Sequence, residues 1–258
     1  MSKANKRERQ RENREKRREF EGKIQRRQRL MKTARTFAII AVPVLIVGVV
    51  LNLNNSSDDT STGSDSKSCA EVKTPPAKKV SLDAPTDTLD VNQSYTATID
   101  TSCGTIAVDL AAQSYPVSVN NFVYLANQKF YDDLAVVRAA KNFVIQTGSP
   151  TQTSSGGPGY SVAAEVPTVE PYYPAGTVAW AKSGAEPAGT AGSQFFIVTG
   201  SAPLPADYAV IGTVSKGLNV ARNIEKLAPK SGDGALTRPV VMKKVTITTG
   251  AIPPATTP

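Results

Sequence analysis

The sequence has 258 residues, enough for one domain with appendages or two small domains, and its 18 Gly and 18 Pro argue against a helical bundle. It contains no histidine and only two cysteines, which excludes Ser-His-Asp and Cys-His catalysis, histidine-ligated metals and thiolate clusters. Residues 1–35 hold fifteen Lys and Arg against five Glu, a net charge of +10, and the remaining residues carry −2, which together give the net charge of +8. No metal and no cofactor are therefore expected.

An apolar run at residues 37–51 follows the basic segment directly and contains no polar side chain. A helix over residues 36–53 would be about 27 Å long at about 1.5 Å per residue, close to the roughly 30 Å of a hydrocarbon core. This pattern predicts an uncleaved transmembrane anchor, in which Pro43 is tolerated. The alternatives are a cleaved secretory signal, although no A-x-A-like site follows the run, and a buried core helix.

The charge asymmetry predicts how this anchor is oriented in the cell membrane. Residues 1–35 are expected to stay in the cytoplasm as a basic tail, because positive flanks are retained on that side. Everything after residue 54 would be extracytoplasmic, or secreted if the anchor were cleaved. Aromatic side chains are not interleaved with the basic residues 6–19, so we expect contact with anionic lipid and not with nucleic acid.

Residues 54–91 are rich in Ser, Thr, Asp and Pro and hold few apolar side chains. This composition is typical of a solvated, partly extended linker that holds a domain away from a surface. Cys69 lies in this linker, and Cys103 lies just inside the patterned region that follows. Outside the cytoplasm, two cysteines are expected to form one disulfide, and two free thiols are the alternative.

From residue 92 onward, short strands alternate with turns. Residues 94–100 and 104–110 alternate apolar and polar side chains around Thr101-Ser-Cys-Gly, which predicts a hairpin. A helix beginning near Ser118 is predicted by apolar residues spaced i, i+3, i+4 and i+7, namely Val119, Phe122, Val123 and Ala126. Further strands are predicted at residues 143–146, 177–181, 194–198, 209–214 and 240–248, and a second helix at residues 218–227.

Many strands with only two helices between them predict a mostly β fold. We expect a closed or nearly closed antiparallel sheet capped by the two helices, and not a βαβ arrangement. Residues 92–250 are enough for one stable core, and residues 251–258 are expected to form a flexible C-terminal tail. The expected order is therefore a basic tail, an anchor, a linker and one β domain.

Several strings within residues 92–250 resemble the cyclophilin family in order and near-spacing, and Gly192-Ser-Gln-Phe-Phe-Ile is among the most diagnostic. The other matching strings are Asn121-Phe-Val-Tyr-Leu, Phe130-Tyr-Asp, Arg138, Phe143-Val-Ile-Gln, Gly156-Gly-Pro-Gly-Tyr, Gly176-Thr-Val-Ala-Trp-Ala and Val210-Ile-Gly. The resemblance implies a cyclophilin-like closed antiparallel β-barrel capped by two α-helices and preceded by the transmembrane helix. The whole layout is similar to that of the membrane-anchored cyclophilins of actinobacteria.

The resemblance implies peptidyl-prolyl cis-trans isomerisation of proline-containing polypeptides, a reaction that needs no metal and no covalent intermediate. Residue by residue, it implies that Arg138 is the catalytic donor, that Gln146 orients Arg138 or binds the peptide backbone, and that Phe196 forms the floor of the proline pocket. The further substrate-binding residues that it implies are Phe143, Val144, Ala181, Gln194, Leu204 and Tyr208.

The sequence departs from the family pattern around this expected site. Val136 and Val137 replace the Phe-His that precedes the catalytic arginine, and Lys182 replaces an amide that contacts substrate. The family's Trp-Leu-Asp-Gly segment becomes Pro203-Leu-Pro-Ala, and Tyr208 stands near the place of a histidine. Because that tryptophan is important for cyclosporin binding in the family, we expect inhibition by cyclosporin to be weak or absent.

These departures support a second hypothesis, in which the domain is a catalytically weak or inactive cyclophilin-like module. Such a module would bind proline-containing segments in a chaperone or scaffold role. Retention of Arg138 together with Gln146 and Phe196 favours the enzyme, with an activity that the departures are expected to reduce. The expected cellular role is to assist or hold exported proteins as they emerge, since uncatalysed X-Pro isomerisation takes roughly tens to hundreds of seconds.

Overall fold

The structure is a computed structural model that describes residues 69–252. The expected basic tail, the anchor, the first part of the linker and residues 253–258 lie outside these residues. Neither helix within residues 69–252 is long and apolar enough to cross a bilayer. The elements are β1 (Gln93–Thr101), β2 (Gly104–Leu110), α2 (Pro116–Asn127), β3 (Leu134–Ala135), β4 (Arg138–Ala140), β5 (Val144–Thr147), β6 (Val162–Ala163), β7 (Thr177–Trp180), β8 (Thr190–Ala191), β9 (Phe195–Val198), β10 (Val210–Lys216), α3 (Leu218–Glu225), β11 (Asp233–Gly234) and β12 (Val241–Ala251).

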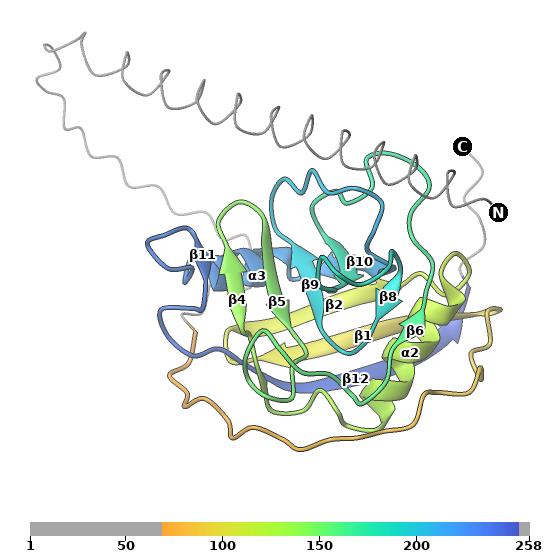
Figure 1. The fold of residues 1–258 in the computed structure, drawn as a ribbon, viewed down its shortest axis with the longest axis horizontal. Helices are drawn as coiled ribbons and strands as arrows, with labels where there is room; N and C mark the ends of the chain where they lie inside the picture. Colours follow the sequence, from red (N-terminus) through yellow and green to blue (C-terminus); the bar gives the residue numbers. More distant parts are fainter. Residues whose placement is uncertain (1–68, 253–258) are drawn as a thin grey trace, which may run out of the picture. The chain divides into compact units, whose positions relative to one another are not determined.

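Ten of the strands form one curled antiparallel sheet, with the order β11-β4-β5-β9-β7-β10-β2-β1-β12-β3 (Figure 1). Strands β3 and β4 belong to one chain segment that pairs with β12 at its start and with β5 at its end. Between them, the amide of Val136 donates to Val240 and the amide of Val137 donates to Gln146. The fold is therefore mostly β and the sheet antiparallel, as expected. The segment that contains β3 and β4 joins the two ends of the sheet, without a continuous ladder of paired strands between them.

The two helices pack on the sheet, α2 against β12 and β10 and α3 against β2 and β5 (Figure 1). Helix α2 begins at Pro116, two residues before the expected start, because proline suits the first turn, where no intrahelical N–H bond is needed. Its own N-cap residue makes no side-chain cap. The carboxylate of Glu165 accepts instead from the amides of Val117 and Ser118 at 2.9 and 3.0 Å.

The barrel core is built by alternation along the strands, whose successive side chains point to opposite faces. Phe195 and Trp180 point into the core and are fully buried together with Phe122 and Tyr131. Phe195, Phe122 and Tyr131 form edge-on or stacked ring pairs with centroids 5.1 to 5.5 Å apart. Phe196, the next residue along β9, belongs to a second apolar cluster on the opposite face of the sheet.

Residues 69–90 have no regular secondary structure, as their composition indicates, but they are not a solvated linker. They run along the outside of the domain (orange in Figure 1), and Leu82 and Leu89 pack against the core. The side chain of Asn120 on α2 binds this segment twice, donating to the carbonyl of Thr86 and accepting from the amide of Thr88. The few apolar side chains of the segment therefore pack against the surface of the domain.

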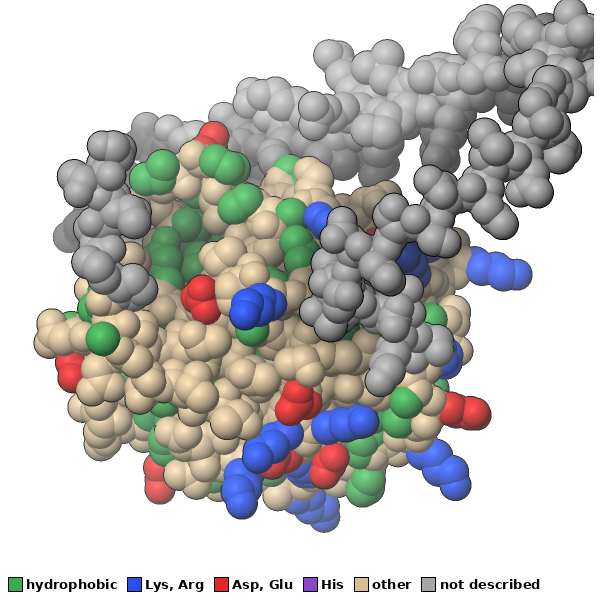
Figure 2. Space-filling view, turned by 180° about the vertical axis from the view of Figure 1, so that it is seen from behind, with side chains coloured by type: hydrophobic (Ala, Val, Ile, Leu, Met, Phe, Trp, Pro, Cys, Tyr) green, Lys and Arg blue, Asp and Glu red, His purple; other side chains and the backbone are tan. Residues whose placement is uncertain are grey.

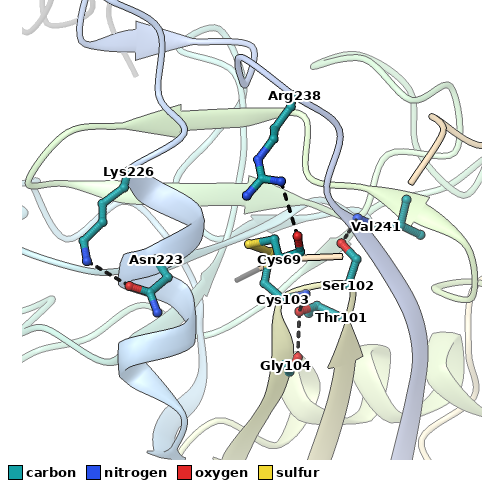
Figure 3. Close-up of a disulfide and its surroundings, with 9 residues drawn as sticks. All are labelled: Cys69, Thr101, Ser102, Cys103, Gly104, Asn223, Lys226, Arg238 and Val241. Atoms are coloured by element: carbon teal, nitrogen blue, oxygen red, sulfur yellow. Dashed lines mark hydrogen bonds between the residues drawn. A yellow bond between two sulfur atoms is a disulfide. The ribbon is translucent and has the colours of Figure 1, made fainter. Parts of the chain in front are cut away.

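The segment begins at a disulfide between Cys69 and Cys103, which lies in the hairpin between β1 and β2 (Figure 3). The amide of Ala70 donates to Ser102 at 2.7 Å, and a guanidinium N–H of Arg238 donates to the carbonyl of Cys69 at 3.3 Å. The hairpin turn is fixed by Thr101, whose hydroxyl donates to the carbonyl of Gly104. The disulfide expected from the cysteine count is thus present in the structure.

On the face shown in Figure 2, acidic and basic side chains are interspersed over a largely polar surface. This mixture agrees with the near-neutral charge of the chain beyond its basic tail. The strongly exposed large apolar side chains of the described residues come from four separate positions, namely Val91, Val117, Val169 and Ile252.

Candidate active site

Strand register places the three residues expected to be catalytic in one row. Arg138 on β4 lies opposite Gln146 on β5, and Gln146 lies opposite Phe196 on β9. Cross-strand partners project from the same face of a sheet, so all three side chains stand on the face that turns away from the barrel core. The apolar run Phe195-Phe-Ile-Val therefore supplies the core with one set of side chains and this site with the other.

A cleft of about 580 Å³ lies over this row. All nine residues expected at the site line it, from β4, β5 and β9 and from the loops that follow β4, β7, β8 and β9. Its remaining walls come from residues 154–161 and from the segment around Lys182 and Glu186. The nine residues are Arg138, Phe143, Val144, Gln146, Ala181, Gln194, Phe196, Leu204 and Tyr208.

Arg138 is held by a two-point ion pair with Asp233, a residue that the sequence analysis did not nominate. Its Nε and Nη2 atoms each donate to one carboxylate oxygen of Asp233 at 2.7 Å, and Nη1 donates to Gln146 at 3.3 Å. Pairing of β11 with β4 brings Asp233 opposite Ala140 and so next to Arg138. The hydrogen bonds that Arg138 donates hold the pKa of the Asp233 carboxyl below its usual value of 3.8.

A relay of side-chain amides continues from Arg138 across the cleft. The Oε1 atom of Gln146 accepts from Arg138, and its Nε2 atom donates to Oε1 of Gln194 at 3.0 Å. The Nε2 atom of Gln194 in turn donates to the carbonyls of Ser154 at 3.3 Å and Gly156 at 2.9 Å. Gln146 and Gln194 are therefore fixed in orientation before any substrate enters.

The floor of the cleft is apolar and aromatic. Phe196 is 5 % exposed and meets the ring of Tyr208 edge-on at 5.5 Å between centroids. The hydroxyl of Tyr173 donates to the carbonyl of Tyr208 and accepts from its amide, at 2.8 and 2.9 Å. Burial raises the pKa of Tyr173 to about 12, so the hydroxyl remains protonated and able to donate at neutral pH. Val144, at 2 % exposure, completes this floor.

The departures from the family pattern have separate places in the structure. Val136 and Val137 are buried, at 7 % and 8 % exposure, in the segment that joins the ends of the sheet. The Lys182 ammonium lies 5.3 Å from the centre of the Tyr208 ring and donates to the carbonyls of Ser183 and Glu186. Among residues 69–252, no group of three or more Cys, Asp or Glu side chains is placed to hold a metal ion.

Sequence reasoning missed Asp233, Tyr173 and the carbonyls of residues 154 and 156. Asp233 is 95 residues from Arg138 and is followed by Gly234, a pair that reads as an ordinary turn. Tyr173 lies in a Pro-rich loop with no periodicity. Neither residue carries a local signal, because each reaches the site through a tertiary contact.

Solved structures define the class of fold. The Cryptosporidium parvum cyclophilin type peptidyl-prolyl cis-trans isomerase superposes with a TM-score of 0.56 and 26 % identity, over 61 % of this chain and 99 % of that one. A second structure of that protein, determined in the presence of the dipeptide Ala-Pro, gives a TM-score of 0.55. The described domain therefore has the cyclophilin fold.

Sequence comparisons agree with this fold. The profile of the family described as cyclophilin type peptidyl-prolyl cis-trans isomerase/CLD matches residues 96–247, more than half of the chain. The chain therefore belongs to this family. It is 36 % identical over 200 residues to a probable isomerase B of Mycobacterium tuberculosis, which covers 72 % of this chain and 60 % of that protein. Isomerase B of Bacillus subtilis is 39 % identical over 46 % of this chain and 82 % of its own length.

A probable isomerase B of Mycobacterium leprae is 35 % identical over 181 residues. This match covers 64 % of the present chain and 58 % of the relative. The chain thus spans somewhat under two thirds of the length of both mycobacterial B-type relatives.

Proposed function

We propose that the protein catalyses cis-trans isomerisation of X-Pro bonds in polypeptides. Rotation about this bond has a barrier of about 18–20 kcal/mol because amide resonance must be broken, and twisting places a lone pair on the prolyl nitrogen. A donor aimed at that lone pair stabilises the twisted state more than the planar state. The observation that supports this reaction is the clamped guanidinium of Arg138 beside an apolar floor.

Within this proposal each residue has one role. Arg138 donates to the prolyl nitrogen, because its three bonds to Asp233 and Gln146 leave two of its five N–H groups without a partner among the described residues. Gln194, together with Gln146, presents fixed amide groups to the peptide backbone. The proline ring rests on the floor formed by the remaining site residues, which are Phe143, Val144, Ala181, Phe196, Leu204 and Tyr208.

The test compares isomerisation of an Ala-Pro peptide by the full chain with that by the Arg138→Ala variant. We expect the parent to accelerate the exchange and Arg138→Ala to lower kcat by about a hundredfold or more, since removal of a donor aimed at developing charge costs about that much. Arg238→Ala is the matched control, because Arg238 binds the Cys69 carbonyl and does not line the cleft. A parent chain with no activity above the uncatalysed rate would refute the proposal.

A second function follows if the parent binds proline peptides but does not turn them over. The observation that favours it is the ion pair with Asp233, which offsets the positive charge of Arg138. In that case the domain is a binding module for proline-containing segments. Titration of the same peptide against the parent and the Phe196→Ala variant shows whether the peptide binds the floor, which both functions need. The exchange rate with the parent then distinguishes the two functions, because only the enzyme raises it.

We further propose that the domain acts outside the cytoplasm on exported polypeptides, anchored by residues 36–53. The apolar run with its basic flank and the Cys69–Cys103 disulfide support this location, since disulfides persist in oxidising compartments. The test is protease treatment of intact and permeabilised cells that express the full chain. If fragments of the domain appear only after the cell membrane has been permeabilised, so that the protease reaches the cytoplasm, the proposed orientation is contradicted.

A further inference from the structure

Residues 76–82, which we call the strap, run behind one wall of the cleft. The wall is the cleft loop, residues 149–159, which has no regular secondary structure. The cleft loop contributes five consecutive residues to the cleft lining, Ser154 to Pro158, whereas the strap contributes none. The strap therefore contacts the site only through the loop in front of it.

Two backbone hydrogen bonds attach the strap to the two ends of the cleft loop. The amide of Lys78 donates to the carbonyl of Pro150, and the amide of Leu82 donates to the carbonyl of Pro158, both at 2.7 Å. Both prolines are buried. A third bond runs from the side chain of Gln152 to the carbonyl of Pro76 at 3.2 Å. The strap thus fixes the separation of the two loop ends.

Within the loop, the buried hydroxyl of Ser149 donates to the carbonyl of Ser155, and the other bonds are formed by hydroxyls at the surface. Thr151, Thr153 and Ser155 share hydroxyl contacts with one another, and all three residues are exposed. Water can replace such contacts at little cost, since exposed hydrogen bonds are exchanged for bonds to solvent. The outer part of the loop is therefore held by the buried Ser149 contact and by the bonds at the loop ends.

The loop carbonyls also determine which way the substrate-facing amides point. Carbonyls only accept, so Ser154 and Gly156 require the NH₂ group of Gln194 to face the loop. The oxygen of Gln194 then faces Gln146, and the oxygen of Gln146 faces Arg138, whose guanidinium only donates. Without the loop carbonyls, one end of this relay loses the partner that sets its direction.

We propose that the strap positions the catalytic amides by holding the cleft loop at both ends. Lys78 and Leu82 are then positioning residues for the reaction, although neither touches the cleft. This inference rests on the proposed isomerase function. It also assigns a role to the segment that the composition alone marks as a linker.

The experiment removes the two amide donors by proline substitution in the full chain, since proline has no N–H. Lys78→Pro and Leu82→Pro are each compared with Asp83→Pro, whose amide has no hydrogen-bond partner among the described residues. Lys78→Ala and Leu82→Ala keep the amides and measure separately the loss of the side chains, of which Lys78 donates to the carbonyl of Asp132 and Leu82 packs on the core. We expect kcat/KM for an Ala-Pro peptide to fall between about tenfold and a hundredfold in Lys78→Pro and Leu82→Pro, because small displacements of catalytic groups cost up to about that much. Equal activity in all three proline variants would overturn the proposal.

A double-mutant cycle separates positioning from general damage to the fold. If the strap acts through Gln194, Leu82→Pro has little further effect on kcat/KM in a Gln194→Ala chain, so the two effects are not additive. Full additivity would contradict the proposed route. The unfolding midpoint is measured for each variant. Gln152→Glu replaces any proline variant that does not fold, because it keeps an oxygen for the amide of Ala135 and removes the NH₂ group that donates to the carbonyls of Pro76 and Asp133.

Amide hydrogen exchange tests the inference without reference to turnover. We expect residues 151–157 to exchange faster in Leu82→Pro than in the parent or in Asp83→Pro, with the protection of β1 and β12 unchanged. Unchanged exchange in the loop overturns the strap inference. If the parent chain is inactive but its loop responds in this way, the isomerase proposal is refuted. The inference that the strap holds the cleft loop is then still supported.

Discussion

Arg138 owes its fixed geometry to a residue far away in the sequence. The planar guanidinium offers parallel N–H groups that match the two oxygens of a carboxylate, and Asp233 uses this match through Nε and Nη2. The side chain of Arg138 is 30 % exposed, so the pair remains in contact with solvent at the edge of the cleft. The ion pair fixes the direction of the remaining N–H groups of Arg138 and contributes little to the free energy of unfolding.

The Asp233→Asn substitution tests this role. An asparagine turns an NH₂ group or a single oxygen toward Arg138, so one of the two bonds is lost and the guanidinium is free to rotate. We expect kcat for an Ala-Pro peptide to fall about tenfold while KM changes little, because misplacement of the donor affects mainly the twisted state. The control is Asp100→Asn in strand β1, outside the cleft; equal loss in both variants would contradict the prediction.

The pH dependence of the reaction follows from the same pair. The Asp233 pKa is lowered by the N–H groups of Arg138, so the pair is fully formed above the ordinary pKa of 3.8 and is lost as pH falls through the lower folded value. The chain has no histidine, the side chain that titrates near neutral pH. We expect kcat/KM to be flat from about pH 5 to 8. A steep change near pH 6.5 in a pH–rate profile would contradict this expectation.

Inhibition by cyclosporin tests the departures at the rim. Pro203 offers no indole ring beside Leu204, and Lys182 places a cation where the family has an amide. We expect weak or no inhibition, measured as the residual exchange rate at cyclosporin concentrations that saturate a cyclophilin with tryptophan at this place. Complete inhibition at the same concentrations would show that the indole is dispensable here.

The residues that line the cleft were largely predictable from the sequence, whereas the residues that hold them in place were not. All nine expected residues line one cleft because the matching strings keep the family order and spacing. Asp233 and Tyr173 were not predicted, because neither lies in a string that resembles the family. Asp233 reaches the site through two-residue pairing of β11 with β4, and Tyr173 through a hydroxyl that binds the backbone of Tyr208. Contacts of this kind have no local sequence pattern.

At the scale of elements, the start of helix α2 is capped by a loop residue from elsewhere in the chain. Its first amides need acceptors, and its N-cap residue Tyr115 provides no side-chain cap. Glu165, 47 residues after Ser118, accepts from both Val117 and Ser118, and its negative charge also suits a helix N-terminus. Glu165 thus serves as the cap of α2 through a contact that no local sequence pattern indicates.

Replacement of this cap should lower stability. We expect Glu165→Ala to reduce the free energy of unfolding by about 1–2 kcal/mol, the usual cost of a lost N-cap. The measurement is urea unfolding of the full chain with linear extrapolation, and Glu71→Ala at an exposed position is the control. An unchanged midpoint for Glu165→Ala would mean that solvent satisfies the α2 amides equally well.

Element positions were predictable from the sequence to within a few residues, because alternation and helical spacing are local properties. The hairpin of β1 and β2 and both helices lie where the patterns indicate. The short pairings of β3, β6, β8 and β11 were not predicted, since two-residue strands carry no periodicity. The packing of residues 69–90 was missed for a related reason: their apolar residues are too sparse to predict burial.

At the scale of the whole molecule, the disulfide ties the start of this packed segment to the sheet. Cys69 and Cys103 are separated by 34 residues. Closing a loop of that length in the unfolded chain is worth roughly 3–4 kcal/mol in the chain-entropy account. We expect Cys69→Ser with Cys103→Ser to lower the free energy of unfolding by about that amount, measured in urea against the oxidised parent.

Reduction of the parent provides the matching control for that prediction. A reductant should shift the unfolding midpoint of the parent toward that of the double variant and leave the double variant unaffected. A parent whose midpoint is the same with and without reductant would contradict the expected contribution of the disulfide. The kcat/KM of the reduced parent then shows whether the strap stays bound to the cleft loop when its N-terminal attachment is released.

The sequence by itself determined the class of fold, the longer strands, both helices and nine residues of the cleft, because the elements follow local periodicity and the nine residues follow from the strings that resemble the family. Tertiary structure decided how the ends of the sheet meet, that residues 69–90 pack on the domain, and that Asp233 clamps Arg138. Each of these depends on contacts between residues far apart in the chain. Such contacts form only when burial of the whole core fixes the strands in register.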